Sequence, residues 1–286
     1  MAKIEIRCPA CSKFGFIEIS EEALDGVTRG LLAVNIPDGV ICEHTFITYI
    51  DKNLDVRDYF MTDFKVELPK STHEEKMKAE SVPSENILDV DLIKLNLYPM
   101  LLTHILKSIF SRKKVVIISE FEFLRKHIQN FFEYITKDSF KVDISIVSEE
   151  EYNRDKKRYK EFMVFKDSEI IRNVDKIINP KKLKVEKQIV HKFISESDLG
   201  YSYIKLKNDV QRAYEICKDI MDLINDYQKL GKKEKLGKNQ LINMFTERTT
   251  IKLSIPYMDF LLEIIKSYFN FDMSIISDYI FPALGI

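Results

Sequence analysis

The sequence predicts an α+β protein in three parts: a β-rich N-terminal module, a central α/β sheet covered by helices, and a helical C-terminal part. Three observations lead to this prediction. Apolar and polar residues alternate in residues 1–69, short apolar runs alternate with helical periodicity in residues 87–194, and mainly helical periodicity continues over residues 195–286. Residues 70–86 are polar and lack apolar periodicity, so we predict a linker there.

Strands are expected throughout the N-terminal module. Five segments alternate apolar and polar side chains, as strands with one buried face do. These segments are KIEIR, GFIEI, LLAVNI, HTFITYID and DFKVEL, at residues 3–7, 15–19, 31–36, 44–51 and 63–68. The turn-forming sequences SKFG, NIPDG and DKN separate them, so we expect hairpins.

The central part alternates helical and strand-like segments. Residues 97–110 have a wide apolar face at helical spacing, and residues 113–119 (KKVVIIS) are a short apolar run typical of a buried parallel strand. Residues 121–135 return to helical spacing, and residues 141–148 and 161–167 are two further strand candidates. This order predicts an α/β sheet with helices packed on it.

From about Ser195 onward the sequence predicts mainly helices. Residues 209–230 form a long amphipathic segment, and Gly231 is expected to end it. Cys217 lies on the apolar face of this segment and is expected to be a small core residue. Shorter helices are predicted at residues 239–245, 255–269 and 273–281.

Composition restricts the classes of function. The chain has 286 residues, 45% of them hydrophobic, and a formal net charge of −1, so the overall basic excess of a nucleic-acid-binding protein is missing. No apolar run reaches the roughly 18 residues of a membrane span, and the N-terminal sequence lacks an apolar signal core. We therefore expect a cytoplasmic protein, in which the four cysteines suit a metal or a buried thiol better than disulfides.

One cysteine pair and one cysteine–histidine pair carry the chemistry of the N-terminal module. Cys8 and Cys11 form a Cys-Pro-Ala-Cys turn followed by Gly15, and such a turn directs two thiolates at one ion. Cys42 and His44 are two residues apart on an apparent strand, so their side chains should leave the same face. Three thiolates and one imidazole complete a tetrahedron without an open position, which predicts a structural zinc ion.

Residues 4–60 resemble a zinc ribbon, and their CPAC sequence resembles the rubredoxin-type knuckle. A Cys-x-His pair replaces the second Cys-x-x-Cys of that pattern, so the fourth ligand is open between His44, which we favour, and His73 or another group. The alternatives are three unligated thiols or a thioredoxin-like redox pair; a redox pair should open a helix, which SKFGFIEIS does not predict. The whole chain is similar to archaeal zinc-ribbon proteins, and that similarity supplies no activity.

A second resemblance concerns residues 101–132. The sequence LLTHILKSIFSRKKVVIISEFEFLRKHIQNFF resembles the start of the central part of a DENN module, where a helix leads through basic residues into a buried strand and then a helix. DENN proteins act on small GTPases in membrane traffic.

The central sheet offers a second candidate site. No glycine-rich loop follows the KKVVIIS run, which argues against a nucleotide-hydrolysing enzyme or a dehydrogenase. Ser119 is expected to cap the next helix, with Glu120 in its first turn. Alternatively, Ser119, Glu120 and Ser148 line the site of an enzyme at the edge of the sheet. His104 is expected to pack on a helix rather than act as a base.

These observations favour a non-enzymatic adaptor or regulatory protein, in which the zinc module and a helical surface dock a macromolecular partner, most readily a protein. An enzyme with its site at the sheet edge is the main rival. A nucleic-acid-binding zinc ribbon is the third, and acidic residues around the ribbon disfavour it.

Because the linker separates the module from the rest, Cys8→Ser should destabilise the module and leave the remainder folded.

Overall fold

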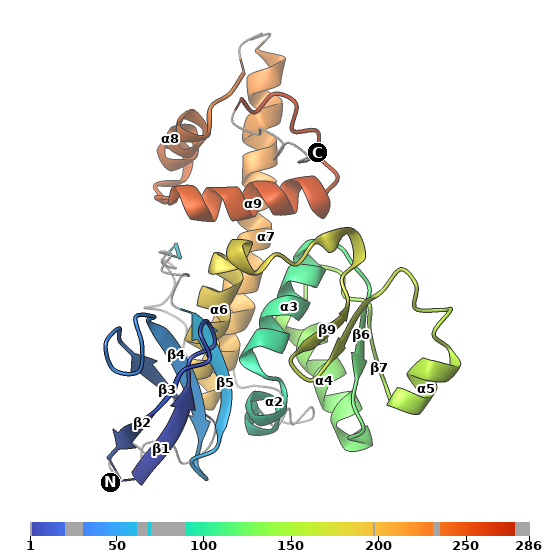
Figure 1. Ribbon diagram of the computed structural model, residues 1–286. Helices are drawn as coiled ribbons and strands as arrows, with labels where there is room; N and C mark the ends of the chain where they lie inside the picture. Colours follow the sequence, from blue (N-terminus) through green and yellow to red (C-terminus); the bar gives the residue numbers. More distant parts are fainter. Residues whose placement is uncertain are drawn as a thin grey trace, which may run out of the picture.

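The computed structural model describes residues 2–20, 31–61, 68–69, 90–196, 198–230 and 235–277 (Figure 1). It confirms the predicted α+β class. Two small antiparallel sheets form the N-terminal region, a mixed sheet with helices forms the centre, and the C-terminal part is helical. The expected strand at residues 63–68 and the predicted linker at residues 70–86 lie almost wholly outside the described residues.

The N-terminal strands follow the alternation in the sequence. β1 (Ala2–Arg7) and β2 (Phe14–Ile19) form an antiparallel hairpin, and β3 (Leu31–Ile36), β4 (Phe46–Asp51) and β5 (Val56–Met61) form an antiparallel sheet in the order β3-β4-β5. The pattern did not reveal β5, because its inner part carries the charged residues of VRDYFM.

The larger sheet is covered on both faces, so β4 is buried along its whole length. One face packs on the hairpin through a small apolar cluster: Ile4, Ile6, Cys8, Ile19, Ile36, Phe46 and Ile50. The opposite face contributes to the main core of the molecule through Leu31, Ile47, Tyr49 and Phe60. The hairpin therefore lies outermost, and the larger sheet separates it from the core.

The central sheet has four strands in the order β7-β6-β8-β9. The first three are parallel and β9 is antiparallel. Their bounds are β6 (Val115–Ile118), β7 (Ile144–Val147), β8 (Met163–Lys166) and β9 (Glu169–Arg172). The three apolar runs predicted as strands are thus confirmed, whereas the short β9, which has two charged residues among its four, was missed.

Helices cover both faces of the central sheet. α3 (Pro99–Phe110) and α4 (Glu122–Ile135) pack with Val115, Ile117 and Met163 in the main core. The other face carries a smaller cluster in which Val116 and Val164 contact two tyrosines from α5 (Glu149–Arg154) and the segment after it. This part of the charged run at residues 149–161 is therefore anchored by buried tyrosines.

The remaining helices belong to the central and C-terminal parts, and the longest of them extends from one part into the other (Figure 1). They are α2 (Val90–Asn96), α6 (Lys184–Ser195), α7 (Leu199–Lys229), α8 (Lys238–Thr249), α9 (Ile255–Ser267) and the 3-10 turns η1 (Val174–Lys176) and η2 (Pro180–Lys182). α6 begins well before Ser195, where helical sequence was expected to start. The helix predicted at residues 273–281 is wrong for its described part: residues 273–277 form turns, with a bridge between Leu236 and Ile276.

A single hydrophobic cluster extends from Leu31 to Ile276 and so includes residues of all three predicted parts. Polar contacts also cross between them. The Tyr49 hydroxyl lies 2.8 Å from Nδ1 of His191 on α6, and the Met100 amide donates to Oδ2 of Asp58 at 2.8 Å. The β3-β4-β5 sheet is therefore joined to the centre by packing and by hydrogen bonds.

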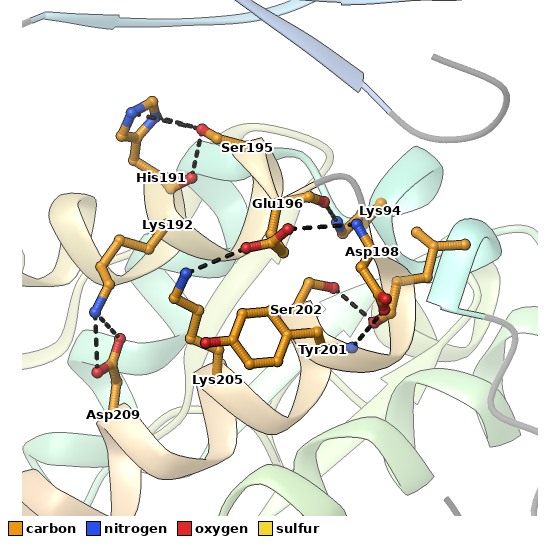
Figure 2. A network of polar contacts seen from close by, with 11 residues as sticks. Lys94, His191, Lys192, Ser195, Glu196, Asp198, Tyr201, Ser202, Lys205 and Asp209 are labelled. Atoms are coloured by element: carbon orange, nitrogen blue, oxygen red, sulfur yellow. Dashed lines mark hydrogen bonds and ion pairs between the residues drawn. The ribbon is translucent and has the colours of Figure 1, made fainter. Parts of the chain in front are cut away.

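A polar network holds the corner between α6 and α7 (Figure 2). The buried Lys94 side chain of α2 donates to the Glu196 carbonyl at 2.8 Å, and the Lys205 ammonium lies 3.2 Å from the Glu196 carboxylate. Asp198 caps α7 by accepting from the Tyr201 amide at 2.8 Å. Because a buried ammonium needs such partners, we interpret this network as structural.

Candidate metal centre

The structure brings together the residues that the sequence singled out as ligands: Cys8, Cys11, Cys42 and His44, hereafter the Cys3His cluster. Their donor atoms all lie within 4.8 Å of one another, and Cys42 Sγ is 3.6 Å from Nδ1 of His44. Tetrahedral zinc with Zn–S bonds of about 2.3 Å sets its sulfur ligands about 3.8 Å apart. The cluster therefore fits a four-coordinate ion after small side-chain rotations.

The first ligand pair lies in a tight loop between β1 and β2. The Cys8 amide donates to the Lys13 carbonyl at 2.8 Å, and the Ser12 amide donates to the Cys8 carbonyl at 2.9 Å. The Ala10 amide points at Cys8 Sγ, 3.4 Å away. Amides directed at a sulfur favour its thiolate form, which is the form that binds metals.

Glycine has a different role in this loop from the one the sequence suggested. The left-handed position of the turn is occupied by Ser12, whose φ is 61°. Gly15 lies on β2, where an added Cβ would come 3.1 Å from a side-chain carbon of Ile41. Gly15 therefore belongs to the strand predicted at residues 15–19 and not to the SKFG turn, and it allows the hairpin to approach the segment before Cys42.

The second ligand pair lies in a loop and not on a strand, since β4 begins only at Phe46. Gly39 has a φ of 85°, and its amide donates to the Cys42 carbonyl at 2.8 Å. This turn brings Cys42 back toward the first pair. The predicted convergence of Cys42 and His44 is correct, but a turn produces it rather than the alternation of a strand.

Burial differs among the ligands: Cys8 is buried, Cys11 is exposed, and the other two are half-buried. Burial alone would raise the pKa of the Cys8 thiol, but hydrogen bonds from the Cys11 and Ala10 amides and from the Cys42 and Cys11 thiols together outweigh it and lower that pKa. Burial raises the pKa of the Cys42 thiol, and the sulfurs of Cys8 and Cys11 raise it further. The hydrogen bond between the Cys8 and Cys42 thiols thus shifts their two pKa values in opposite directions, as neighbouring thiols of one centre do.

The structure also bears on the alternative fourth ligand, on the thioredoxin-like redox pair and on the role of Cys217. His73 lies outside the described residues. The loop after Cys11 leads into β2 rather than a helix, which argues against a thioredoxin-like pair. Cys217 is buried on α7, with its sulfur 3.6 Å from the Leu261 carbonyl, and this confirms it as a core residue.

The second candidate site is a cavity at the edge of the central sheet. Ser119 and Glu120 line this cavity, whose volume is about 210 Å³. Ser119 is not the N-cap of α4, because that helix begins at Glu122 after Phe121; its hydroxyl accepts from the Phe121 amide at 3.3 Å. Ser148 lies outside the lining and caps α5 in a capping box.

Among the described residues, no helix combines the length and the apolar character needed to cross a bilayer.

Comparison of the chain with protein-family models, with curated proteins and with solved structures found no match. The resemblances to a zinc ribbon and to a DENN module therefore remain predictions. What the structure itself establishes is a cluster of three thiols and one imidazole that could hold a metal ion.

Proposed function

We propose that this protein is a non-enzymatic adaptor whose N-terminal module is held by a structural zinc ion and docks a protein partner. The observation that supports it most is the convergence of the Cys3His cluster, with all donor atoms within 4.8 Å, from two loops far apart in the sequence. Thiolate and imidazole ligands in a tetrahedron suit zinc. Four protein ligands leave no position for substrate, so the ion would stabilise structure rather than catalyse a reaction.

The β1–β2 hairpin requires stabilisation beyond its own hydrogen bonds and apolar contacts. A two-stranded sheet is marginal in water, and this one has only a small apolar cluster beneath it. A bound ion would tie the loop between β1 and β2 to the loop before β4. Metal binding would thereby supply folding free energy that the small cluster lacks.

The outer face of this hairpin is the surface we assign to docking. Cross-strand pairing places six exposed side chains on it, hereafter the hairpin face: Lys3, Glu5, Arg7, Phe14, Phe16 and Glu18. Phe14 is 67% exposed and Phe16 54% exposed, and the Lys3 ammonium lies 4.7 Å from the centre of the Phe16 ring. Exposed aromatic side chains with a polar surround are typical of protein interfaces.

Charge favours a protein over a nucleic acid at the hairpin face. Its two cations are balanced by its two anions, so the face carries no net charge. Nucleic-acid binding depends on cations that displace counterions from phosphates. A neutral face with two aromatic rings suits a protein partner with its own mixed charges. The contribution of a helical surface to docking remains a prediction.

The metal is tested by measuring zinc in the purified full-length chain. We expect about one zinc per chain and loss of it in Cys42→Ser. Cys217→Ala changes a cysteine outside the cluster and should keep the metal. Replacement by cobalt should give the absorption bands of tetrahedral thiolate coordination. A fully folded wild-type chain without metal would refute the structural role.

Docking is tested by affinity capture from the native cell with quantitative mass spectrometry. We compare the wild type with Phe14→Ser/Phe16→Ser and with Phe123→Ser, a control phenylalanine that is 60% exposed and lies outside the module. The proposal expects the same proteins to be lost with the double variant and retained with the control. Equal capture by all three proteins would contradict it. Loss of capture after nuclease treatment would favour the nucleic-acid alternative.

A further inference from the structure

The cavity beside Ser119 lies where the central sheet reverses its winding direction. The chain leaves β6 through α4 to reach β7 on one side, then passes through α5 to β8 on the other side of β6. In sheets of this kind the segments that follow the two adjacent strands diverge, and a crevice opens at their carboxyl ends. Residues that follow β6 and β8 line the cavity, as this topology predicts.

An apolar floor and a polar rim are combined in this cavity. The floor is built by side chains from the α2–α3 corner, β6 and α4: Leu97, Leu101, Ile117, Leu124 and Ile128. The rim carries Ser119 and Glu120 after β6, and Lys166 and Asp167 at the end of β8. Pockets that bind small molecules have this composition, with a few polar groups that orient the ligand.

One exposed aromatic ring lines the cavity, and a second ring packs against it from outside the lining. Phe121 lines it and is 57% exposed, and its ring lies 5.9 Å from that of Phe123 in an edge-to-face arrangement. Rings as exposed as these add little to folding, because most of their surface remains in water. The Phe121 ring is available to cover a ligand.

The rim is acidic. The Lys166 ammonium pairs with the Glu149 carboxylate at 2.8 Å, so this cation is already neutralised. Glu120 is held in place, since one of its oxygens accepts from the Glu149 amide at 2.8 Å. Asp167 stands in the two-residue β8–β9 turn with a φ of 51°, a left-handed conformation that aspartate tolerates better than most residues. Three carboxylates therefore surround one ammonium.

We propose that this cavity binds a small organic cation, an ammonium group joined to an apolar body. The ammonium would lie at the rim between Glu120 and Asp167, where it can also face the Phe121 ring. The apolar body would rest on the leucines and isoleucines of the floor. A phosphorylated ligand is disfavoured by the same carboxylates and by the lack of glycines after β6.

The proposal is tested on the full chain by NMR and calorimetry with defined probes. The probes are 2-phenylethylamine and cyclohexylmethylamine, with 2-phenylethanol as the neutral match and phenylacetate as the anion. We expect both amines to shift the amide signals of residues 119–121 and 167. The amines should bind about tenfold more tightly than the alcohol, the difference that one favourable charge interaction supplies. Phenylacetate should leave these amides unchanged.

Matched variants distinguish the effect of the rim carboxylates on amine binding from that of carboxylates elsewhere on the surface. Glu120→Gln/Asp167→Asn should weaken amine binding about tenfold. Glu133→Gln removes an exposed carboxylate about 16 Å along α4 from the start of the helix and should have no effect. The site is refuted if neither amine shifts the rim amides, if amine and alcohol bind equally, or if the double variant binds like the wild type. None of these results depends on the metal centre or on the hairpin face.

Discussion

At the scale of single residues, Asp58 shows how one side chain joins two parts of the molecule. It lies on β5, and its carboxylate accepts from the Met100 amide and the Tyr59 amide, each at 2.8 Å. Met100 is in the first turn of α3, whose own N-cap residue, Tyr98, makes no side-chain cap. Asp58 therefore caps this helix from 42 residues away.

Burial raises the pKa of the Asp58 carboxyl group to about 6, although the two amide hydrogen bonds oppose the shift. The folded state thus holds the proton more strongly than the unfolded state, so the contribution of this group to stability falls as the pH rises from about 4 to above 6. We expect the difference in unfolding free energy between wild type and Asp58→Asn to decrease by about 3 kcal/mol over this range. Urea unfolding at several pH values measures it, and a pH-independent difference would contradict it.

At the scale of elements, the β1–β2 hairpin and the β3-β4-β5 sheet depend on different interactions. The hairpin has one apolar face against the larger sheet and one face in water. The larger sheet is also packed on the main core, through Tyr49 and Phe60 among others. If the Cys3His cluster holds zinc, loss of the ion should affect these two elements unequally.

Cys8→Ser tests this difference by hydrogen exchange of the full chain. We expect amides of β1 and β2 to exchange faster, because the hairpin loses its tie to the loop before β4. Amides of β4 should remain protected, since both of its ladders and its core contacts persist. A chelator should reproduce the effect in wild type and add nothing in the variant. Equally fast exchange in β4 and β1 would mean that the larger sheet also depends on the metal.

At the scale of the whole molecule, a buried ion network links the central and C-terminal helices. The Lys107 ammonium of α3 lies 2.8 Å from Glu263 of α9 and 3.5 Å from Glu186 of α6. Lys107 and Glu186 are almost completely buried, at 3% and 1% exposed. Burial lowers the pKa of Lys107, but the two carboxylates outweigh it and raise that pKa. Their charges therefore depend on each other.

Lys107→Met should destabilise the whole chain by about 3–5 kcal/mol, because it leaves the Glu186 carboxylate buried without a counter-charge. Adding Glu186→Leu should recover most of the loss, since the second change removes the isolated charge. Urea unfolding followed by circular dichroism measures both variants. Losses that simply add would show that the two charges do not interact.

Much of this fold could be predicted from local sequence. Alternation revealed β1 to β4, apolar runs revealed β6, β7 and β8, and the Cys3His cluster followed from ligand chemistry and spacing. β5 and α6 were missed because each contains charged residues whose ion-pair or hydrogen-bond partners lie in other elements. In β5, Arg57 pairs with Asp51 and Asp58 caps α3. In α6, Glu186 is buried beside Lys107, so its sequence does not show a clean apolar face.

The sequence by itself determined the class of the fold, most strands and helices, and the residues able to hold a metal ion. These are local properties, set by periodicity over a few residues and by the chemistry of individual side chains. Only the tertiary structure decided that Ser119 lines a cavity instead of capping a helix, and that one hydrophobic cluster includes residues of all three predicted parts. These features depend on contacts between segments that are distant in sequence, such as the Tyr49–His191 pair 142 residues apart, and local patterns do not specify such contacts.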